Sequence, residues 1–364
     1  MAARSGNWLK VLGWGIAGAF VAREVLRRRN RLELSGARVL VTGGSRGLGF
    51  AAARSFVRAG AHVAICARDD EELARARSLL VDEAARLGGD EPAQVVALRA
   101  DVTDERAAER LVAETIRQLG GIDVLVNCAV EIAVGPVEAM TGRDFEQAFR
   151  GIFLALYQPT QAVLPHLRAA GQGRIVNVTS VAGKAPIPHA STYVVGKYAT
   201  TGFSAVLATE LRKYGIRVST VMPPPMRNGA WMNAAYKGQA EQELSWFAAA
   251  LGLPFGSIDP ERAARAIVRA ARYGEAEVMV APVSWLLSRF HALFPSLSIY
   301  LTALMERHLL PSTPLGARAL PAQQGAEILL DAATPGVRRA VRMGRKYGER
   351  YLQPVAAKLN GAGS

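Results

Sequence analysis

From residue 35 onward, short apolar runs alternate with longer stretches whose apolar residues recur at helical spacing. The short runs are continuously apolar, which is typical of strands covered by helices on both faces of a parallel sheet. The predicted strands are residues 38–41, 62–66, 95–99, 124–127, 174–178, 217–222 and 277–280, and the predicted helices include residues 71–87, 104–119, 143–169 and 193–214. This order predicts an α/β fold with a doubly wound parallel sheet, whose ligand crevice lies at the carboxyl ends of the strands.

The first predicted strand runs into a glycine turn, after which residues 50–59 are rich in alanine and have helical spacing. A strand, a glycine turn and a helix in this order direct the free N–H groups of the helix toward an anion, and glycine lets a pyrophosphate approach the backbone. The spacing, Gly43-x3-Gly47-x-Gly49, differs from the commoner GxGxxG, and a glycine turn alone is weak support for a cofactor site. The candidate cofactor-binding residues of the turn are Thr42, Gly43, Ser45, Arg46, Gly47, Leu48 and Gly49.

The end of the second predicted strand bears on which dinucleotide binds. A site for NAD usually carries an acidic side chain there for the ribose 2′-hydroxyl, whereas the 2′-phosphate of NADP attracts guanidinium groups. Ala67 supplies no acid, Arg68 follows it, and Arg46 lies inside the glycine turn. We therefore expect NADP(H) rather than NAD(H); the alternative is two solvated arginines. The ends of the next two strands add the candidates Asp101, Val102 and Asn127, of which Asp101 is placed to accept from the adenine amino group.

Tyr193 and Lys197 lie four residues apart in a predicted helix, so their side chains share one face. A phenol with a pKa of about 10 is a poor base at neutral pH, but a nearby ammonium lowers that pKa and makes the pair a workable acid or base. Ser180 follows the fifth predicted strand and is placed to hydrogen-bond a carbonyl or alkoxide oxygen. Taken singly, Tyr193 and Lys197 are typical of an exposed helical pair. Together with the glycine turn and the strand ends in this order, they predict a catalytic site.

This set of motifs resembles the classical short-chain dehydrogenase/reductase family over residues 34–282. The likeness comprises TGGSRGLG from Thr42, Asp101-Val102, NCA from Asn127, SVAG from Ser180, YVVGK from Tyr193, and Asp259-Pro260-Glu261. The resemblance implies a Rossmann fold and hydride transfer between a nicotinamide and a carbonyl or alcohol carbon. It implies that Tyr193 donates or accepts the proton, that Lys197 lowers the pKa of Tyr193 and holds the nicotinamide ribose, and that Ser180 binds the substrate oxygen. It also gives further cofactor-binding candidates, namely Asn127, Ala129, Tyr193, Lys197 and Pro223.

The chain departs from the family's pattern at three places. The strand-end motif of the family reads NNAG, and here Val130 stands where a glycine usually lies beside the cofactor ribose. Ile152 takes the position of the asparagine that supports a water-mediated proton relay in the family. Pro223 is followed by two more prolines where the family has Pro-Gly, and Asn228 replaces a frequent threonine. These departures keep open an alternative function, a membrane-associated NADP-binding interaction or redox-sensing protein with weak or vestigial catalysis.

The net charge of +13 is concentrated outside the predicted sheet. Residues 1–31 hold seven arginines and lysines against one glutamate, and residues 311–364 hold eight against three acidic residues. Such basic segments favour contact with an anionic membrane surface; nucleic acid is the weaker alternative, because no nucleic-acid motif accompanies them. The two cysteines, Cys66 and Cys128, lie in apolar runs, so we expect both to be reduced and buried. We expect no metal site.

Two apolar segments flank a single predicted catalytic domain, residues 32–282. In the leader, residues 1–31, an apolar run from Trp8 to Ala22 is followed by a basic cluster, which favours a retained membrane anchor with the domain on the cytoplasmic side. The alternative is an amphipathic or core-packed leader. Residues 283–310 are unusually apolar, and we favour a membrane-interfacial segment over oligomer packing.

Between the predicted sheet and these flanks, residues 226–254 form the segment that covers the substrate in this family. It either binds a lipophilic ligand or packs on itself through its large apolar side chains, Trp231, Met232, Tyr236, Trp246 and Phe247. The basic tail, residues 311–364, carries no catalytic pattern. The sequence thus predicts a membrane-associated, NADP(H)-dependent oxidoreductase for a small lipophilic ketone, aldehyde or alcohol, compatible with a homo-oligomer and without a nucleic-acid partner.

Overall fold

The computed structural model describes residues 30–88, 92–252, 256–330, 335 and 350–353. Its main sheet has seven strands, all parallel, in the order β3-β2-β1-β4-β6-β7-β9. The strands are β1 (Arg38–Thr42), β2 (His62–Ala67), β3 (Val95–Arg99), β4 (Val124–Asn127), β6 (Gly173–Val178), β7 (Ile216–Met222) and β9 (Glu277–Met279). The strand order reverses between β1 and β4, which is the point where ligands bind in sheets of this kind.

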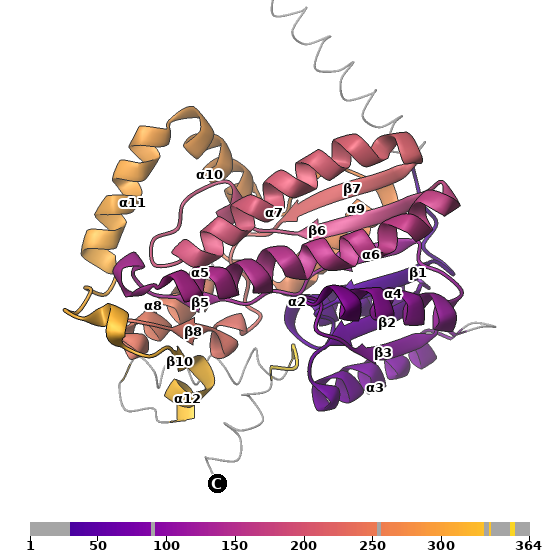
Figure 1. The fold of residues 1–364 in the computed structure, drawn as a ribbon, viewed down its shortest axis with the longest axis horizontal. Helices are drawn as coiled ribbons and strands as arrows, with labels where there is room; N and C mark the ends of the chain where they lie inside the picture. Colours follow the sequence, from indigo (N-terminus) through magenta and orange to yellow (C-terminus); the bar gives the residue numbers. More distant parts are fainter. Residues whose placement is uncertain (1–29, 89–91, 253–255, 331–334, 336–349, 354–364) are drawn as a thin grey trace, which may run out of the picture.

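Helices cover both faces of this sheet (Figure 1). The helices on one face are α2 (Gly47–Arg58), α3 (Asp70–Leu87) and α9 (Pro260–Tyr273), and those on the other are α4 (Glu105–Leu119), α6 (Ala155–Ala170) and α7 (Ser191–Glu210). Successive strand residues point to opposite sides, so Val39 and Val41 lie in the first core and Leu40 in the second. The predicted doubly wound parallel sheet is therefore confirmed.

The long helix predicted over residues 143–169 is wrong in its middle. The chain instead forms α5 (Gly142–Phe149), a π-helical turn (Arg150–Leu154) and then α6. Pro159, inside α6, has no N–H to donate to the carbonyl of the fourth residue before it, so the helical hydrogen bonds are also interrupted just after the π turn. The π turn brings Ile152 against Gly196 of helix α7.

A second, smaller unit lies beyond the carboxyl ends of the main strands. Its sheet has the order β10-β8-β5, built from β5 (Ala133–Val134), β8 (Ala235–Tyr236) and β10 (Gln323–Gln324). With it pack the 3₁₀ turn η5 (Ala230–Asn233), α8 (Ala240–Gly252) and α12 (Gly325–Leu330). Trp231, Met232 and Tyr236 are buried in the core of this unit, so these three predicted lid residues pack the lid itself.

The apolar segment predicted over residues 283–310 forms two helices, α10 (Pro282–Leu293) and α11 (Pro295–Leu309), which pack on each other at one edge of the molecule (Figure 1). None of the described helices is long and apolar enough to span a membrane. The leader's apolar run, from Trp8 to Ala22, lies outside the described residues, as does most of the basic tail. The short 3₁₀ turns are η1 (Val137–Ala139), η3 (Val181–Gly183), η4 (Leu211–Tyr214) and η6 (Ala317–Ala319).

Candidate active site

The glycine turn joins β1 to α2 through contacts that tolerate no side chain at two positions. Gly43 has φ +66°, and a Cβ there would lie 2.8 Å from the Ala129 Cα atom. A Cβ on Gly49 would lie 2.0 Å from the Gly43 carbonyl oxygen. The turn therefore packs tightly against the end of β4 and has backbone rather than side chains at these positions, which fits a close approach by the pyrophosphate of a dinucleotide. Leu48 points the other way, into the core.

Thr42 and Asn127 hold the two central strand ends together. The Thr42 hydroxyl accepts hydrogen bonds from the Cys128 N–H (3.0 Å) and the Ala129 N–H (3.3 Å). The Asn127 side-chain amide donates to Thr160 Oγ1 and Asn177 Oδ1, both at 2.9 Å. The Asn127 amide nitrogen is thus committed to neighbouring elements and helps to fix the backbone, whereas Asn127 Oδ1 is buried without a hydrogen-bond partner.

The two arginines expected at the adenosine end both have carboxylate partners. Arg68 donates to Glu131 at 2.6 Å, and this pair is largely exposed. Arg46 donates to Glu72 at 2.8 Å, and the other oxygen of the same carboxylate accepts from the Ser45 hydroxyl at 3.0 Å. Sequence reasoning missed both acidic partners. The signal for Glu72 was its position three residues after Asp69, the N-cap of α3.

Asp101 and Val102 follow β3 and behave differently. The Asp101 carboxylate is exposed and accepts from the Thr103 N–H at 3.0 Å, whereas the Val102 side chain lies in the core beneath. Pro223 follows β7, and its carbonyl oxygen accepts from the Val181 N–H at 3.2 Å. Pro223 is thereby tied to the residue that follows Ser180.

Ser180, Tyr193 and Lys197 converge at the end of β6 and the start of α7. The Ser180 hydroxyl forms a hydrogen bond with the Tyr193 phenol and also accepts from the Ala182 N–H at 3.1 Å. The Lys197 ammonium donates to the Val178 carbonyl oxygen at 3.1 Å and lies 5.5 Å from the centre of the Tyr193 ring. The end of β6 and the start of α7, which follow each other in the chain with only η3 between them, thus bring a hydroxyl, a phenol and an ammonium together.

Burial determines the acidities in this cluster. It raises the pKa of Tyr193 to about 12, and the hydrogen bond with Ser180 lowers it only in part. Burial also lowers the pKa of Lys197 to about 8. From the sequence we expected the neighbouring ammonium to lower the pKa of Tyr193, whereas in the structure the desolvation of this half-buried side chain raises it. Desolvation disfavours the charged form of each group, so the phenol holds its proton and the ammonium releases its proton more readily.

Two departures from the family's pattern take definite positions in the structure. Ile152 is 2 % exposed and packs directly on Gly196. A Cβ on Gly196 would lie 2.8 Å from the Ile152 side chain. Gly196 lies between Tyr193 and Lys197 in α7, so an apolar side chain faces α7 at this point. Val130, by contrast, is 41 % exposed beyond β4.

Both cysteines are free: Cys66 is buried in β2 as expected, whereas Cys128, just after β4, is only half-buried. Burial raises the pKa of each to about 12. Across the described residues, no group of three or more histidine, cysteine, aspartate or glutamate side chains is placed to hold a metal ion.

Comparisons with known proteins agree with this geometry. The family model described as short chain dehydrogenase matches residues 37–238. The chain is 33 % identical over 258 residues to an Anopheles gambiae dehydrogenase/reductase SDR family protein 7-like, covering 71 % of this chain and 78 % of the relative. It is 28 % identical to the 3-dehydrosphinganine reductase of Danio rerio, covering 71 % of this chain and 75 % of the relative.

Among solved structures, a putative short-chain alcohol dehydrogenase from Sinorhizobium meliloti superposes with a TM-score of 0.56 at 26 % identity, covering 70 % of this chain and 98 % of that chain. A short chain dehydrogenase from Mycobacterium smegmatis superposes with a TM-score of 0.55 at 26 % identity, covering 68 % and 93 %. The chain therefore belongs to the short-chain dehydrogenase/reductase family, whose members are oxidoreductases that bind an NAD(P) cofactor and act on alcohol and carbonyl groups.

Proposed function

We propose that the protein is an NADP(H)-dependent oxidoreductase that transfers a hydride between nicotinamide and a carbonyl or alcohol carbon of a lipophilic substrate. The observation that carries the proposal is the convergence of Ser180, Tyr193 and Lys197 beside the glycine turn, with the Tyr193 phenol hydrogen-bonded to Ser180. This is the set of groups that a carbonyl reduction needs at its oxygen: a proton donor, a hydrogen-bond donor and a nearby cation.

In the reductive direction, the Tyr193 phenol donates its proton to the substrate oxygen, while the Ser180 hydroxyl donates a hydrogen bond to the same atom. The raised pKa of Tyr193 keeps the phenol protonated at neutral pH, so the proton that the reduction needs is present before the substrate binds. The Lys197 ammonium lies near enough to stabilise the phenolate left after proton transfer. A bound nicotinamide supplies the hydride.

A preference for NADP(H) is supported by the two guanidinium groups at the adenosine end. Arg68 and Arg46 each hold a carboxylate, from Glu131 and Glu72, in the geometry of a charge-assisted hydrogen bond. A 2′-phosphate offers the same kind of acceptor with more charge. No acidic side chain stands at Ala67, where an NAD site usually has one.

A lipophilic substrate and a membrane location are supported by the surface of α10 and α11. Leu286 is 61 % exposed and Tyr300 is 62 % exposed, and further exposed apolar residues on these helices are Trp285, Leu287, Leu293, Phe294, Leu297, Ile299, Leu301 and Leu309. Apolar surface of this extent marks an interaction site. Helix α10 contacts η3, the turn that follows Ser180, so this surface lies beside the catalytic loop. The basic cluster after the leader's apolar run favours a membrane-associated protein with its catalytic domain on the cytoplasmic side.

The proposal is tested with purified protein, NADPH and a panel of ketones and aldehydes of increasing chain length. We expect NADPH oxidation with the longer substrates and a loss of at least about a hundredfold in kcat for Tyr193→Phe. Tyr198→Phe is the matched control, because Tyr198 lies on the same helix but is 42 % exposed. Equal rates for wild type and Tyr193→Phe would overturn the proposed role of the phenol.

The second candidate, a cofactor-binding interaction or redox-sensing protein with vestigial catalysis, is favoured by one observation. Ile152 places an apolar side chain against α7 at the position where the family's proton relay has an amide. Micromolar NADPH binding without turnover across the whole panel would support this candidate, and turnover would exclude it.

A further inference from the structure

Residues 350–353, called here the tail segment, lie far along the chain from the glycine turn and nevertheless contact it. The Gly47 N–H, the first of helix α2, donates a hydrogen bond to the Tyr351 carbonyl oxygen at 2.8 Å. This N–H belongs to the set of free donors that a glycine turn presents to a pyrophosphate. A backbone carbonyl of the same chain therefore occupies a donor of the expected phosphate site.

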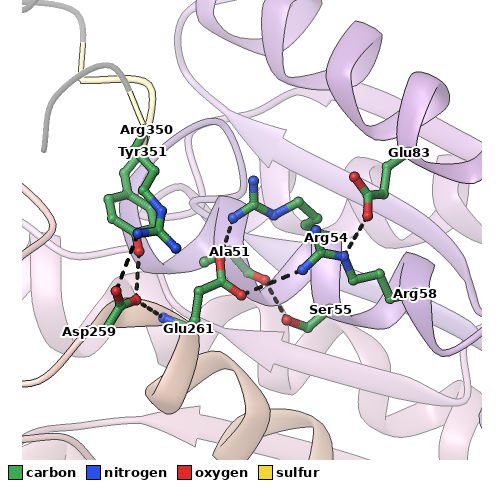
Figure 2. Close-up of polar contacts among 9 residues, drawn as sticks. All are labelled: Ala51, Arg54, Ser55, Arg58, Glu83, Asp259, Glu261, Arg350 and Tyr351. Carbon is green, nitrogen blue, oxygen red and sulfur yellow. Dashed lines mark hydrogen bonds and ion pairs between the residues drawn. The ribbon is translucent and has the colours of Figure 1, made fainter. Parts of the chain in front are cut away.

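The tail segment is held beside the turn by the N-terminus of α9. The Tyr351 side chain is 1 % exposed, and its hydroxyl donates to Asp259 Oδ1 at 2.7 Å. Arg350 reaches the other oxygen of the Asp259 carboxylate at 3.4 Å. Figure 2 shows both side chains extending from the tail segment to Asp259, the N-cap of α9.

The same helix end is linked to α2. Glu261, in the first turn of α9, forms ion pairs with Arg54 and with Arg58, the latter at 3.8 Å (Figure 2). Arg58 also donates to Glu83 of α3 at 2.5 Å. Ion pairs thus connect the first turn of α9, which holds the tail segment, to α2, whose N-terminus the tail segment contacts.

Gln353 extends the contact across to the loop that follows β7. Its side chain is 4 % exposed; the amide donates to the Asn228 carbonyl oxygen at 2.7 Å, and the amide oxygen accepts from Asn233. A Cβ on Gly47 would lie 3.5 Å from Gln353 Nε2. Gln353 therefore lies between the glycine turn and the loop in which Asn228 replaces the family's frequent threonine.

The backbone of the tail segment is shaped for this position. Leu352 has φ +55°, in the left-handed region that residues with a side chain rarely adopt. Such a conformation persists only where the surrounding contacts impose it. The hydrogen bonds of Tyr351 and Gln353 on either side of Leu352 supply that constraint.

We propose that the tail segment and the pyrophosphate of the dinucleotide compete for the N-terminus of α2, so that the chain's own residues 350–353 are a ligand of its cofactor site. The Tyr351 carbonyl oxygen and a phosphate oxygen are both acceptors for the same Gly47 N–H, and Gln353 fills the space beside it. Dinucleotide binding then requires the tail segment to leave. The inference rests on the dinucleotide binding in the proposed function.

The experiment compares two truncated proteins with the full chain by calorimetric titration. One lacks residues 350–364 and the other lacks residues 354–364, so the second retains the tail segment and is the matched control. Removal of the tail segment should lower the apparent Kd for NADPH and for NADH by about fivefold or more, and the control should leave both unchanged. Adenosine 2′-monophosphate, which has no 5′-phosphate to meet Gly47, should bind all three proteins equally.

Two outcomes contradict the competition. An unchanged or higher Kd for NADPH in the protein that lacks residues 350–364, with equal binding of adenosine 2′-monophosphate, would mean that the tail segment does not compete with the cofactor. If no protein binds either dinucleotide, the proposed function itself fails, and the inference with it.

A second measurement uses the intact chain and does not depend on the folding of the truncated protein. Hydrogen exchange of the amides in residues 350–353 should become faster when NADPH is saturating, because the tail segment is displaced. Slower exchange would show instead that the tail segment closes over the bound dinucleotide, which overturns the proposal.

Discussion

Replacing Arg68 with alanine tests the proposed cofactor preference. Arg68 follows β2, on the adenosine side of the site, and its guanidinium donates to Glu131 at 2.6 Å. The Arg68 side chain is 60 % exposed and that of Glu131 is 32 % exposed. An exposed pair of this kind contributes about 0–1 kcal/mol, so Arg68 loses little when it exchanges this carboxylate for a phosphate.

The magnitude follows from that exchange. A hydrogen bond to a charged group contributes about 1.5–3 kcal/mol, and subtracting about 0–1 kcal/mol for the lost ion pair leaves about 0.5–3 kcal/mol. For the contact between Arg68 and the 2′-phosphate we use the middle of this range, about 1–2 kcal/mol. We therefore expect Arg68→Ala to raise KM for NADPH by about 5- to 30-fold. KM for NADH, which has no 2′-phosphate, should change less than about twofold.

The assay is steady-state reduction of one carbonyl substrate with each cofactor in turn. Glu131→Gln is the matched variant, because it releases Arg68 from its partner without removing the guanidinium; it should leave KM for NADPH unchanged or lower it. Equal increases in KM for NADPH and NADH in Arg68→Ala would refute the reasoning, since they would show that Arg68 acts on structure rather than on the phosphate.

Three further predictions follow from the geometry. Gly43→Ala should lower the free energy of unfolding by about 2 kcal/mol or more and abolish NADPH binding, because φ +66° and the 2.8 Å approach to Ala129 exclude a side chain. Urea denaturation measures the loss of stability, and Gly142→Ala is the control, because a Cβ at Gly142 meets nothing within 4 Å. Wild-type stability in Gly43→Ala would contradict the prediction. The pKa of Lys197, lowered by burial to about 8, means that its ammonium loses its proton as the pH rises through that value; kcat/KM for NADPH should therefore fall above about pH 8, and a flat profile to about pH 10 would show that this charge is not used. Leu286→Glu combined with Leu301→Glu should weaken co-sedimentation with anionic vesicles by about fivefold or more. The control Leu79→Glu, at an exposed leucine of α3, should leave co-sedimentation unchanged. Equal co-sedimentation of the double variant and the control would argue against α10 and α11 as the membrane contact.

The sheet could be predicted from the sequence because its strands are continuously apolar. Val39 and Val41 face one core and Leu40 faces the other. A strand needs apolar residues at every position only when helices cover both faces of its sheet. The proximity of Ser180, Tyr193 and Lys197 could be predicted because Tyr193 and Lys197 share a helix face, and Ser180 follows the end of β6.

Features that depend on contacts between distant residues could not be predicted. The apolar content of residues 226–254 was visible, but not that Trp231 and Tyr236 point into the core of the lid. The raised pKa of Tyr193 follows from its burial, which the spacing of the motif does not express. The contact between Gly47 and Tyr351 joins residues about three hundred positions apart through backbone atoms, and no side-chain pattern marks it.

The central claim is that hydride moves between nicotinamide and a carbonyl carbon beside the Tyr193 phenol. The most direct test supplies NADPH deuterated at the reactive ring carbon together with a long-chain ketone, and examines the alcohol by mass spectrometry. The account predicts an alcohol that carries deuterium at its carbinol carbon with the wild-type protein, and no alcohol above background with Tyr193→Phe. An alcohol without deuterium, or the same yield from both proteins, would contradict it.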